Sequence, residues 1–393
     1  MSLLVKAILL YRYCEILYCK HYFLEKEDLS MKSKVFVLLV GLLCMAFVFS
    51  AVPQQCYAAS NVINFKFAHI FPPPAKQSKI CEAFVTELEE RTGGRIKTSY
   101  LGGGSLLKPP GMYRGIELGV ADMGFAHVEY TPGRFPVTEA CDMPLGYPSA
   151  WVANHVVNDF YNKFKPKEWN KVKVLWMHSS PPNVMITTKP VRKLEDLKGM
   201  TIRAPGRVGD TVKALGASPA PMPIMEVYDG LAKGVINGVN IPFETLRTFR
   251  FAEVAKYTTA TWKVGNLYTF YVIMNKNSYK KLPPDLKETF DILCGEYKER
   301  MALMWNEIDF DGKDFARKKG VENIELPPGE LARWVSVTNQ VIEGYIKDMT
   351  SKGYSEGEVR GWIKFLHERI DYWTNKQIGY RIKSATGPEE FLR

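Results

Sequence analysis

The chain has 393 residues, of which 46% are hydrophobic and 12% aromatic, so it can bury one large core or two medium ones. Its 52 Lys and Arg residues outnumber its 42 Asp and Glu residues, which gives a formal net charge of +10, but no long run of basic residues occurs. This spread of charge is typical of a solvated globular surface, and it excludes a basic nucleic-acid-binding arm.

The N-terminal segment predicts export. A stretch that begins at Met31 carries two lysines, then an apolar run over 35–52, then small residues up to Ala59. This is the order of a secretory signal peptide, so we interpret residues 31–59 as a signal peptide that is cleaved from the mature protein. We interpret residues 1–30 as an extension from a start codon assigned too early. The apolar run is long enough that an uncleaved membrane anchor is the alternative.

The first elements after this segment alternate between strand and helix. Residues 64–70 alternate apolar and polar side chains, which predicts a strand, and residues 78–91 carry apolar positions at helical spacing. Residues 95–101 alternate again and run into the three glycines 102–104. A strand, helix, strand unit is the building block of a mostly parallel sheet.

The same alternation continues to residue 242. We predict further strands at 122–126, 173–178, 200–204 and 237–242, and helices at 110–118, 208–215 and 225–233. Because no low-complexity linker or internal repeat separates these units, we expect two closely connected α/β lobes.

From Pro284 onward the pattern becomes helical. Long helices are predicted at 285–318 and 328–352, and the apolar positions of these helices include Trp305 and Trp334. Bulky aromatic residues at helical spacing usually face a core, so we interpret them as packing anchors.

The part of the sequence beyond residue 59 carries no known catalytic or metal-binding motif. None of its histidines has the spacing of H-E-x-x-H, and neither a G-x-S-x-G elbow nor a Walker loop occurs. Its cysteines lie far apart without a C-x-x-C pair, which indicates buried thiols with at most one bridge. These cysteines are Cys81, Cys141 and Cys294. We therefore expect no enzyme activity, no metal and no cofactor.

Arg203 is the candidate ligand-binding residue that the pattern itself indicates. It ends a short predicted strand just before Pro205 and Gly206, so its side chain should project at the carboxyl end of the sheet, where open α/β folds bind ligands. A guanidinium offers a planar fork of donors that matches a carboxylate and stays charged at physiological pH. A surface salt bridge is the alternative role.

Several motifs then resemble one family. The pattern D-L-K-G-M-x-I-R-x-P at 196–205 is followed by L-G-A-S-P-x-P-M at 215–222, E-V-Y-x-G-L at 226–231 and G-V-x-x-P at 238–242. Together with E-E-R-T-G-G-R-I-K at 89–97 and F-P-V-T-E-A-C-D-M-P at 135–144, this order resembles the binding proteins of TRAP transporters, the DctP-like family. The resemblance covers residues 62–375 in order.

The resemblance implies an α/β, two-lobed periplasmic-binding-protein fold (type II-like), with a ligand cleft between the lobes and long C-terminal bracing helices. We assign residues 62–180 and 268–300 to lobe 1 and residues 181–267 to lobe 2. The helices of residues 301–393 are expected to pack across both lobes. Arg203 occupies the position whose arginine commonly pairs with the ligand carboxylate in that family.

Other positions expected to line the cleft depart from the family pattern. Ile241 stands before Pro242 where many members carry Asn, and Asn240 lies one step earlier. Ile224 replaces an aromatic residue that often follows the P-M pair, and His127 replaces an acidic residue of the sugar-acid binders. The two isoleucines would make the pocket more apolar. The further candidate contacts and donors are His127, His69, Arg207 and Tyr228.

We therefore predict an extracytoplasmic solute-binding protein that captures a small organic anion, a carboxylate, and delivers it to a TRAP-type permease. The apolar replacements favour a monocarboxylate with an apolar or aromatic body over a sialic acid or a C4-dicarboxylate. The expected location is the periplasm, the expected state is a monomer or dimer, and no nucleic-acid partner is expected. A periplasmic ligand sensor and a secreted enzyme acting on a carboxylate are the alternatives.

Overall fold

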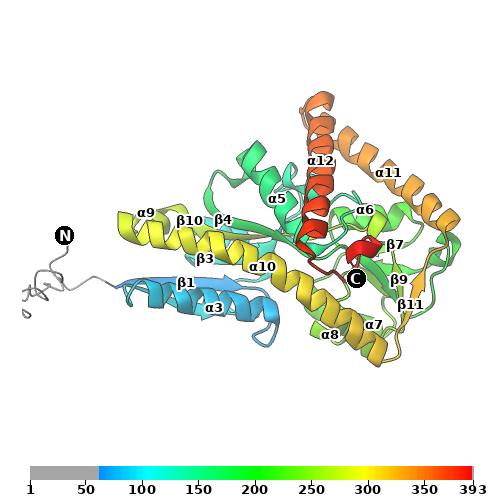
Figure 1. Ribbon diagram of the computed structural model, residues 1–393, viewed down its shortest axis with the longest axis horizontal. Helices are drawn as coiled ribbons and strands as arrows, with labels where there is room; N and C mark the ends of the chain where they lie inside the picture. The colour runs from blue at the N-terminus through cyan, green and yellow to red at the C-terminus, as the bar shows by residue number, and fades with distance from the viewer. Residues whose placement is uncertain (1–61, 392–393) are drawn as a thin grey trace, which may run out of the picture. The chain divides into compact units, whose positions relative to one another are not determined.

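The structure is a computed structural model that describes residues 62–391 (Figure 1). These residues form mixed α/β architecture with two sheets, as the sequence predicts. The predicted N-terminal extension and signal peptide, residues 1–59, lie outside the described residues. Among residues 62–391, no helix combines the length and the apolar character that a membrane span requires.

The first sheet has five strands in the order β2-β1-β3-β10-β4. In chain order these are β1 (Ile63–His69), β2 (Ile96–Leu101), β3 (Met123–His127), β4 (Val172–Ser179) and β10 (Thr269–Asn275). Strand β1 pairs in parallel with β2 and β3, whereas β10 runs antiparallel to both of its neighbours, β3 and β4. All seven residues of β10 are buried, as expected for a central strand that is covered on both faces.

Helix α5 (Ala150–Phe164) protects the outer edge of this sheet. Strand β4 lies at the edge, so its outward peptide groups need partners. Asn154 bonds the carbonyl and amide groups of Ser179 at 2.9 and 3.2 Å, and Asn158 bonds those of Met177 at 2.6 and 3.1 Å. Two asparagines at helical spacing thus satisfy the end of β4, which leads directly into the cavity described below.

The second sheet has six strands in the order β11-β9-β5-β8-β6-β7. They are β5 (Val184–Thr187), β6 (Thr201–Arg203), β7 (Ser218–Ala220), β8 (Gly238–Ile241), β9 (Tyr257–Ala260) and β11 (Glu322–Glu325). Strand β6 is parallel to β7 and β8, and β5 is antiparallel to β8 and β9. Strand β11 corrects the expectation that residues 301–393 contribute only helices, because it pairs in parallel with β9.

The short helices lie between strands, and three long helices follow β10. The short ones include α3 (Lys76–Arg91), α4 (Met112–Leu118), α6 (Arg207–Ala214), α7 (Val227–Ala232), α8 (Thr245–Thr248) and α9 (Lys276–Lys280). The long ones are α10 (Pro284–Lys318), α11 (Pro328–Ser351) and α12 (Glu356–Tyr380). Helix α10 contacts α3, α5 and β4 of the first sheet and also α8, which follows β8 of the second sheet (Figure 1). Helix α12 packs on α5, and α11 packs on both α12 and α6.

The chain passes between the two sheets after β4 and again before β10. These two connections lie side by side, because the Ser180 amide donates to the Tyr268 carbonyl at 3.0 Å and the Asn183 amide donates to the Asn266 carbonyl at 2.9 Å. The Tyr268 amide donates in turn to the Ser180 hydroxyl at 3.1 Å. Paired connecting segments of this kind place residues of both sheets around one point.

Candidate functional site

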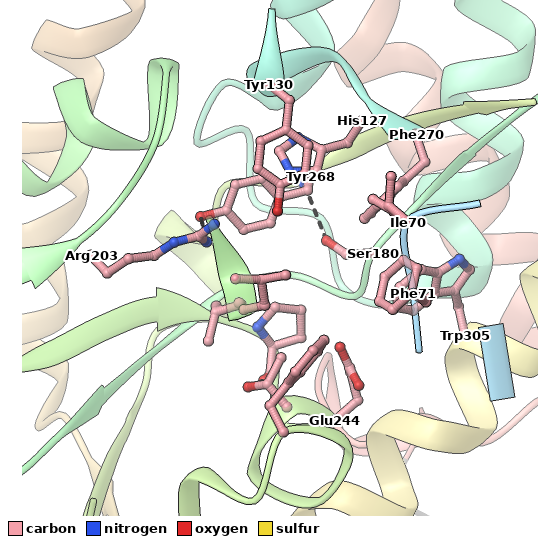
Figure 2. Close-up of a pocket in the computed structure, with 15 residues that line it drawn as sticks. Ile70, Phe71, His127, Tyr130, Ser180, Arg203, Glu244, Tyr268, Phe270 and Trp305 are labelled. Atoms are coloured by element: carbon pink, nitrogen blue, oxygen red, sulfur yellow. Dashed lines mark hydrogen bonds between the residues drawn. The ribbon is translucent and has the colours of Figure 1, made fainter. Parts of the chain in front are cut away.

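A cavity of about 40 Å³ lies where strands of the two sheets end (Figure 2). The lining residues are Ile70, Phe71, His127, Tyr130, Ser180, Arg203, Ile224, Ile241, Pro242, Glu244, Thr245, Phe249, Tyr268, Phe270 and Trp305. They follow the carboxyl ends of β1, β3, β4, β6 and β8, and they include residues of β10 and α10. This is the place at which open α/β sheets bind ligands.

Arg203 is the basic anchor of the cavity. Its side chain is only 1% exposed, since β6 lies inside the second sheet between β7 and β8. Its Nε donates to the Met222 carbonyl at 3.1 Å, and its Nη1 donates to the Tyr268 hydroxyl at 3.3 Å. Within residues 62–391 it has no carboxylate partner. A buried guanidinium without a counter-ion is costly, so this arrangement favours an anion in the cavity.

His127 and Tyr130 form the wall next to Arg203. Their ring centroids are 3.6 Å apart, and the buried Nδ1 of His127 has no hydrogen-bond partner. Burial, and after it the positive charge of Arg203, hold the pKa of His127 well below its ordinary value. Burial raises the pKa of Tyr130, although Arg203 opposes this shift. Both side chains are therefore neutral at physiological pH, and Arg203 carries the positive charge on this side.

The rest of the wall is largely aromatic. Phe71 contacts three other lining rings, those of Phe249, Phe270 and Trp305, at centroid distances of 6.2, 5.9 and 6.1 Å. Phe270 and Trp305 lie 5.3 Å apart. Edge and tilted contacts of this kind are the preferred arrangement of aromatic rings, and together these rings offer an apolar aromatic surface to a bound molecule.

Four of the residues that the sequence indicated line the cavity. Arg203, His127, Ile224 and Ile241 come together there from three different strands and one turn. Their contact with a ligand stays a prediction.

The other four candidates lie outside the cavity lining. His69 is fully buried, its Nδ1 accepts from the Phe71 amide at 3.0 Å, and its Nε2 lies 3.2 Å from the Gln77 carbonyl oxygen. Burial lowers the pKa of His69 to about 3, so the ring is neutral. Its geometry positions Phe71 and leaves no ring nitrogen for a ligand. Asn240 is also outside the lining, and its main-chain carbonyl accepts a hydrogen bond from the Tyr268 hydroxyl at 3.0 Å.

Arg207 and Tyr228 are occupied elsewhere. The Arg207 side chain pairs with Glu139 at 2.8 Å and with Asp348 of α11, and its amide donates to Glu129 at 3.1 Å. These contacts connect α6 to Glu129 and Glu139, which follow β3 of the first sheet, and to α11. The Tyr228 hydroxyl donates to Glu253 at 3.0 Å on the surface. Because both side chains already have partners away from the cavity, neither is placed to contact a ligand in it.

Reasoning from sequence missed several lining residues, above all Tyr130, Tyr268, Glu244 and the phenylalanines. Trp305 was expected to pack, and it does, with its Nε1 donating to His178 at 3.0 Å, but its ring also lines the cavity. No group of His, Cys, Asp and Glu residues in the described part of the chain could hold a metal ion. The three cysteines of this part are buried and free, which agrees with the prediction of buried thiols with at most one bridge.

Comparison with known proteins assigns the family. Residues 67–348 match the family of bacterial extracellular solute-binding proteins, family 7, also called DctP. A solute-binding protein of Albidiferax ferrireducens is 26% identical over 297 residues, which cover 72% of this chain and 86% of the relative. The 2,3-diketo-L-gulonate-binding periplasmic protein of Escherichia coli is 25% identical over 299 residues, which cover 73% and 88%.

Solved structures that resemble this chain are also solute-binding proteins. A TRAP periplasmic solute-binding protein from Desulfovibrio salexigens is 32% identical with a TM-score of 0.69, and the match covers 79% of this chain and 96% of that one. A second structure is a TRAP solute-binding protein from a marine metagenome, specific for aromatic acid ligands and in complex with metahydroxyphenylacetate. It is 25% identical with a TM-score of 0.75, and the match covers 79% of this chain and 99% of that one. These structures confirm the predicted fold class. The chain therefore belongs to family 7 of the bacterial extracellular solute-binding proteins, the DctP family that its motifs resemble.

Proposed function

We propose that this protein captures a monocarboxylate with an aromatic body outside the cytoplasm and delivers it to a TRAP-type permease. One observation carries the choice of ligand: Arg203 is buried in the cavity wall, without a carboxylate partner among residues 62–391, beside a largely aromatic surface.

The charge balance of the cavity supports one carboxylate. Arg203 is the single Lys or Arg among the described lining residues, and His127 is neutral. One guanidinium pairs with one carboxylate in a fork of two parallel hydrogen bonds. A second carboxylate on the ligand would find no cation, so the cavity is better suited to a monocarboxylate than to a C4-dicarboxylate.

The aromatic wall supports a flat, apolar ligand body. The rings of Phe71, Phe249, Phe270 and Trp305 form one continuous contact group, and Ile224 and Ile241 replace residues that would be aromatic or polar in the family pattern. The metagenome relative whose name specifies aromatic acid ligands has the higher TM-score of the two structures described above.

Family membership supports the remaining parts of the proposal. A member of an extracellular solute-binding family needs an export signal, and the predicted signal peptide at 31–59 would supply it. The mature protein would then act in the periplasm, as a monomer or dimer, with the permease as its protein partner. It would return its ligand unchanged, as a binding protein and not an enzyme.

Thermal unfolding with matched ligands tests this proposal. A ligand that binds only the folded protein stabilises it by about 2.7 kcal/mol at one hundred times its Kd. We expect benzoate, phenylacetate or a hydroxylated derivative to raise Tm by several degrees, and benzamide and benzyl alcohol, which lack the negative charge, to have no effect. Equal stabilisation by the neutral compounds, or none by any aromatic acid, would refute it. Mass spectrometry of small molecules released from the purified protein checks the result independently.

A further inference from the structure

The cavity lining also contains an acidic residue, Glu244, which the charge pairing at Arg203 does not use. Glu244 lies at the start of α8, lines the cavity and is only 3% exposed. Its Oε2 is buried without a hydrogen-bond partner. A buried carboxyl oxygen without a partner loses the hydration it had in the unfolded chain, so it needs a reason beyond packing.

The surroundings of Glu244 offer no cation. Its amide donates to Asp309 Oδ1 of α10 at 3.1 Å, and Asp309 is itself buried with its Oδ2 unpartnered. Neither carboxyl group forms an ion pair within the part of the chain that the structure describes. Burial raises the pKa of Glu244 to about 7, although side-chain hydrogen bonds with Thr248 and Gln77 lower it, and burial raises the pKa of Asp309 to about 8. An internal salt bridge therefore does not explain these groups.

Glu244 and Arg203 belong to different sides of the cavity. Arg203 is held by Met222 and by Tyr268 of the connecting segment. Glu244 is held by Asp309, which lies one helical turn beyond Trp305 in α10. Figure 2 shows Arg203 pointing toward Tyr268 and Glu244 on the side of Phe71 and Trp305. A ligand that spans the cavity from Arg203 across the aromatic wall would end near Glu244.

We infer that Glu244 is a specificity-determining residue that accepts a hydrogen bond from a hydroxyl group at the end of the ligand remote from its carboxylate. This inference rests on the proposed function, and it narrows the ligand class to hydroxylated aromatic monocarboxylates. A carboxyl group accepts a hydrogen bond from a hydroxyl whether or not it is ionised, so the contact does not depend on the protonation of Glu244. An aromatic acid without the hydroxyl leaves Oε2 unpartnered, and a dicarboxylate would bury a second carboxylate where the described lining offers no second cation.

Calorimetry with matched ligands and variants tests the inference. The ligands are phenylacetate, its 2-, 3- and 4-hydroxy derivatives and 4-carboxyphenylacetate. For the wild type we expect the best hydroxy isomer to bind at least about tenfold more tightly than phenylacetate, since hydrogen bonds to carboxyl groups are among the stronger ones. We expect 4-carboxyphenylacetate to bind more weakly than phenylacetate.

Variants assign the preference to Glu244. In Glu244→Leu the ratio of the affinities for the hydroxy isomer and for phenylacetate should fall to within about threefold. Glu244→Gln keeps an acceptor oxygen and should retain part of the preference. The matched control Glu226→Gln changes an exposed glutamate outside the lining, and it should keep the full wild-type ratio.

The outcomes separate this inference from the proposed function. Binding of phenylacetate with no preference for any hydroxy isomer, or an undiminished preference in Glu244→Leu, overturns the inference and leaves the proposed function standing. Failure of every aromatic acid to bind the wild type overturns both. If Glu244→Leu does not fold, the wild-type ratio and the Glu244→Gln variant still decide. Tighter binding of 4-(aminomethyl)benzoate than of 4-(hydroxymethyl)benzoate would show that Glu244 recognises an ammonium group and overturns the hydroxyl assignment.

Discussion

Replacing Arg203 by Met separates a ligand-binding role from a structural one. Methionine keeps an unbranched side chain in the buried space and removes the charge. Two hydrogen bonds are lost, to Met222 and to the Tyr268 hydroxyl, but that hydroxyl still donates to the Asn240 carbonyl. Because the wild-type guanidinium has no counter-ion when the cavity is empty, we expect the ligand-free variant to unfold within a few degrees of the wild-type Tm.

The loss should appear in ligand affinity. Removing one partner of a buried charge pair costs about 3–5 kcal/mol, which raises Kd by roughly two to three and a half orders of magnitude. Arg203→Lys keeps the charge but loses the planar fork, so we expect an intermediate increase of about 10- to 100-fold. Calorimetry with the tightest aromatic acid measures both. The control is Arg192→Met, which removes an exposed arginine paired with Glu322 and should leave Kd unchanged. Affinity of Arg203→Met within about threefold of the wild type would refute the assignment.

Three further predictions concern the glycine that precedes α6, the buried carboxyl group of Glu244 and the buried thiols. Gly206→Ala should destabilise the fold by about 2 kcal/mol or more in urea unfolding, because its φ is +54° and a Cβ there would meet Glu129 Oε2 at 1.4 Å. The control is Gly234→Ala, where φ is also positive but the space around the Cβ is open, and it should cost about 1 kcal/mol. The pKa of Glu244 is about 7 in the folded protein against an ordinary value of 4.5, so this group contributes stability that is present below pH 4.5 and is lost as the pH rises through 7. The free energy of unfolding of Glu244→Gln, relative to that of the wild type, should therefore increase by up to about 3 kcal/mol from pH 4 to pH 8. A difference between the two proteins that does not depend on pH would contradict this prediction. Burial raises the pKa of all three thiols of the described part, so protein starting at Ser60 should react with a thiol reagent only after denaturation, and rapid reaction of the native protein would show that the thiols are accessible.

Much of the fold was predictable because apolar spacing dominates its early elements. The alternation at 64–70 and 95–101 predicted β1 and β2 to within a residue or two, and the helical spacing at 78–91 predicted most of α3. Helix α5 was not predicted, and its buried face includes Asn154 and Asn158, which satisfy the edge strand. Strand β11 buries only Ile324 of its four residues, so it has almost no pattern of its own and depends on pairing with β9.

The site was predictable where a residue has a fixed relation to a strand end. Arg203 fits this rule, because it ends β6 before a turn. The aromatic wall does not, since Phe71, Phe249, Phe270 and Trp305 lie far apart in the chain and meet only when two sheets and α10 are assembled. Glu244 had no signal either, because its burial comes from α10, whose Asp309 lies 65 residues later in the sequence.

The strand order of the first sheet also bears on when this protein can fold. Strand β10 enters between β3 and β4, although the chain makes it almost one hundred residues after β4. Until Thr269–Asn275 has emerged, β3 and β4 each lack a neighbour at positions that are buried in the finished sheet, and unpaired buried peptide groups are costly. The N-terminal half cannot therefore complete its sheet early during synthesis. For the export that we propose, this arrangement would give the chain time, because the late strand would keep the sheet open until after Thr269–Asn275 is made.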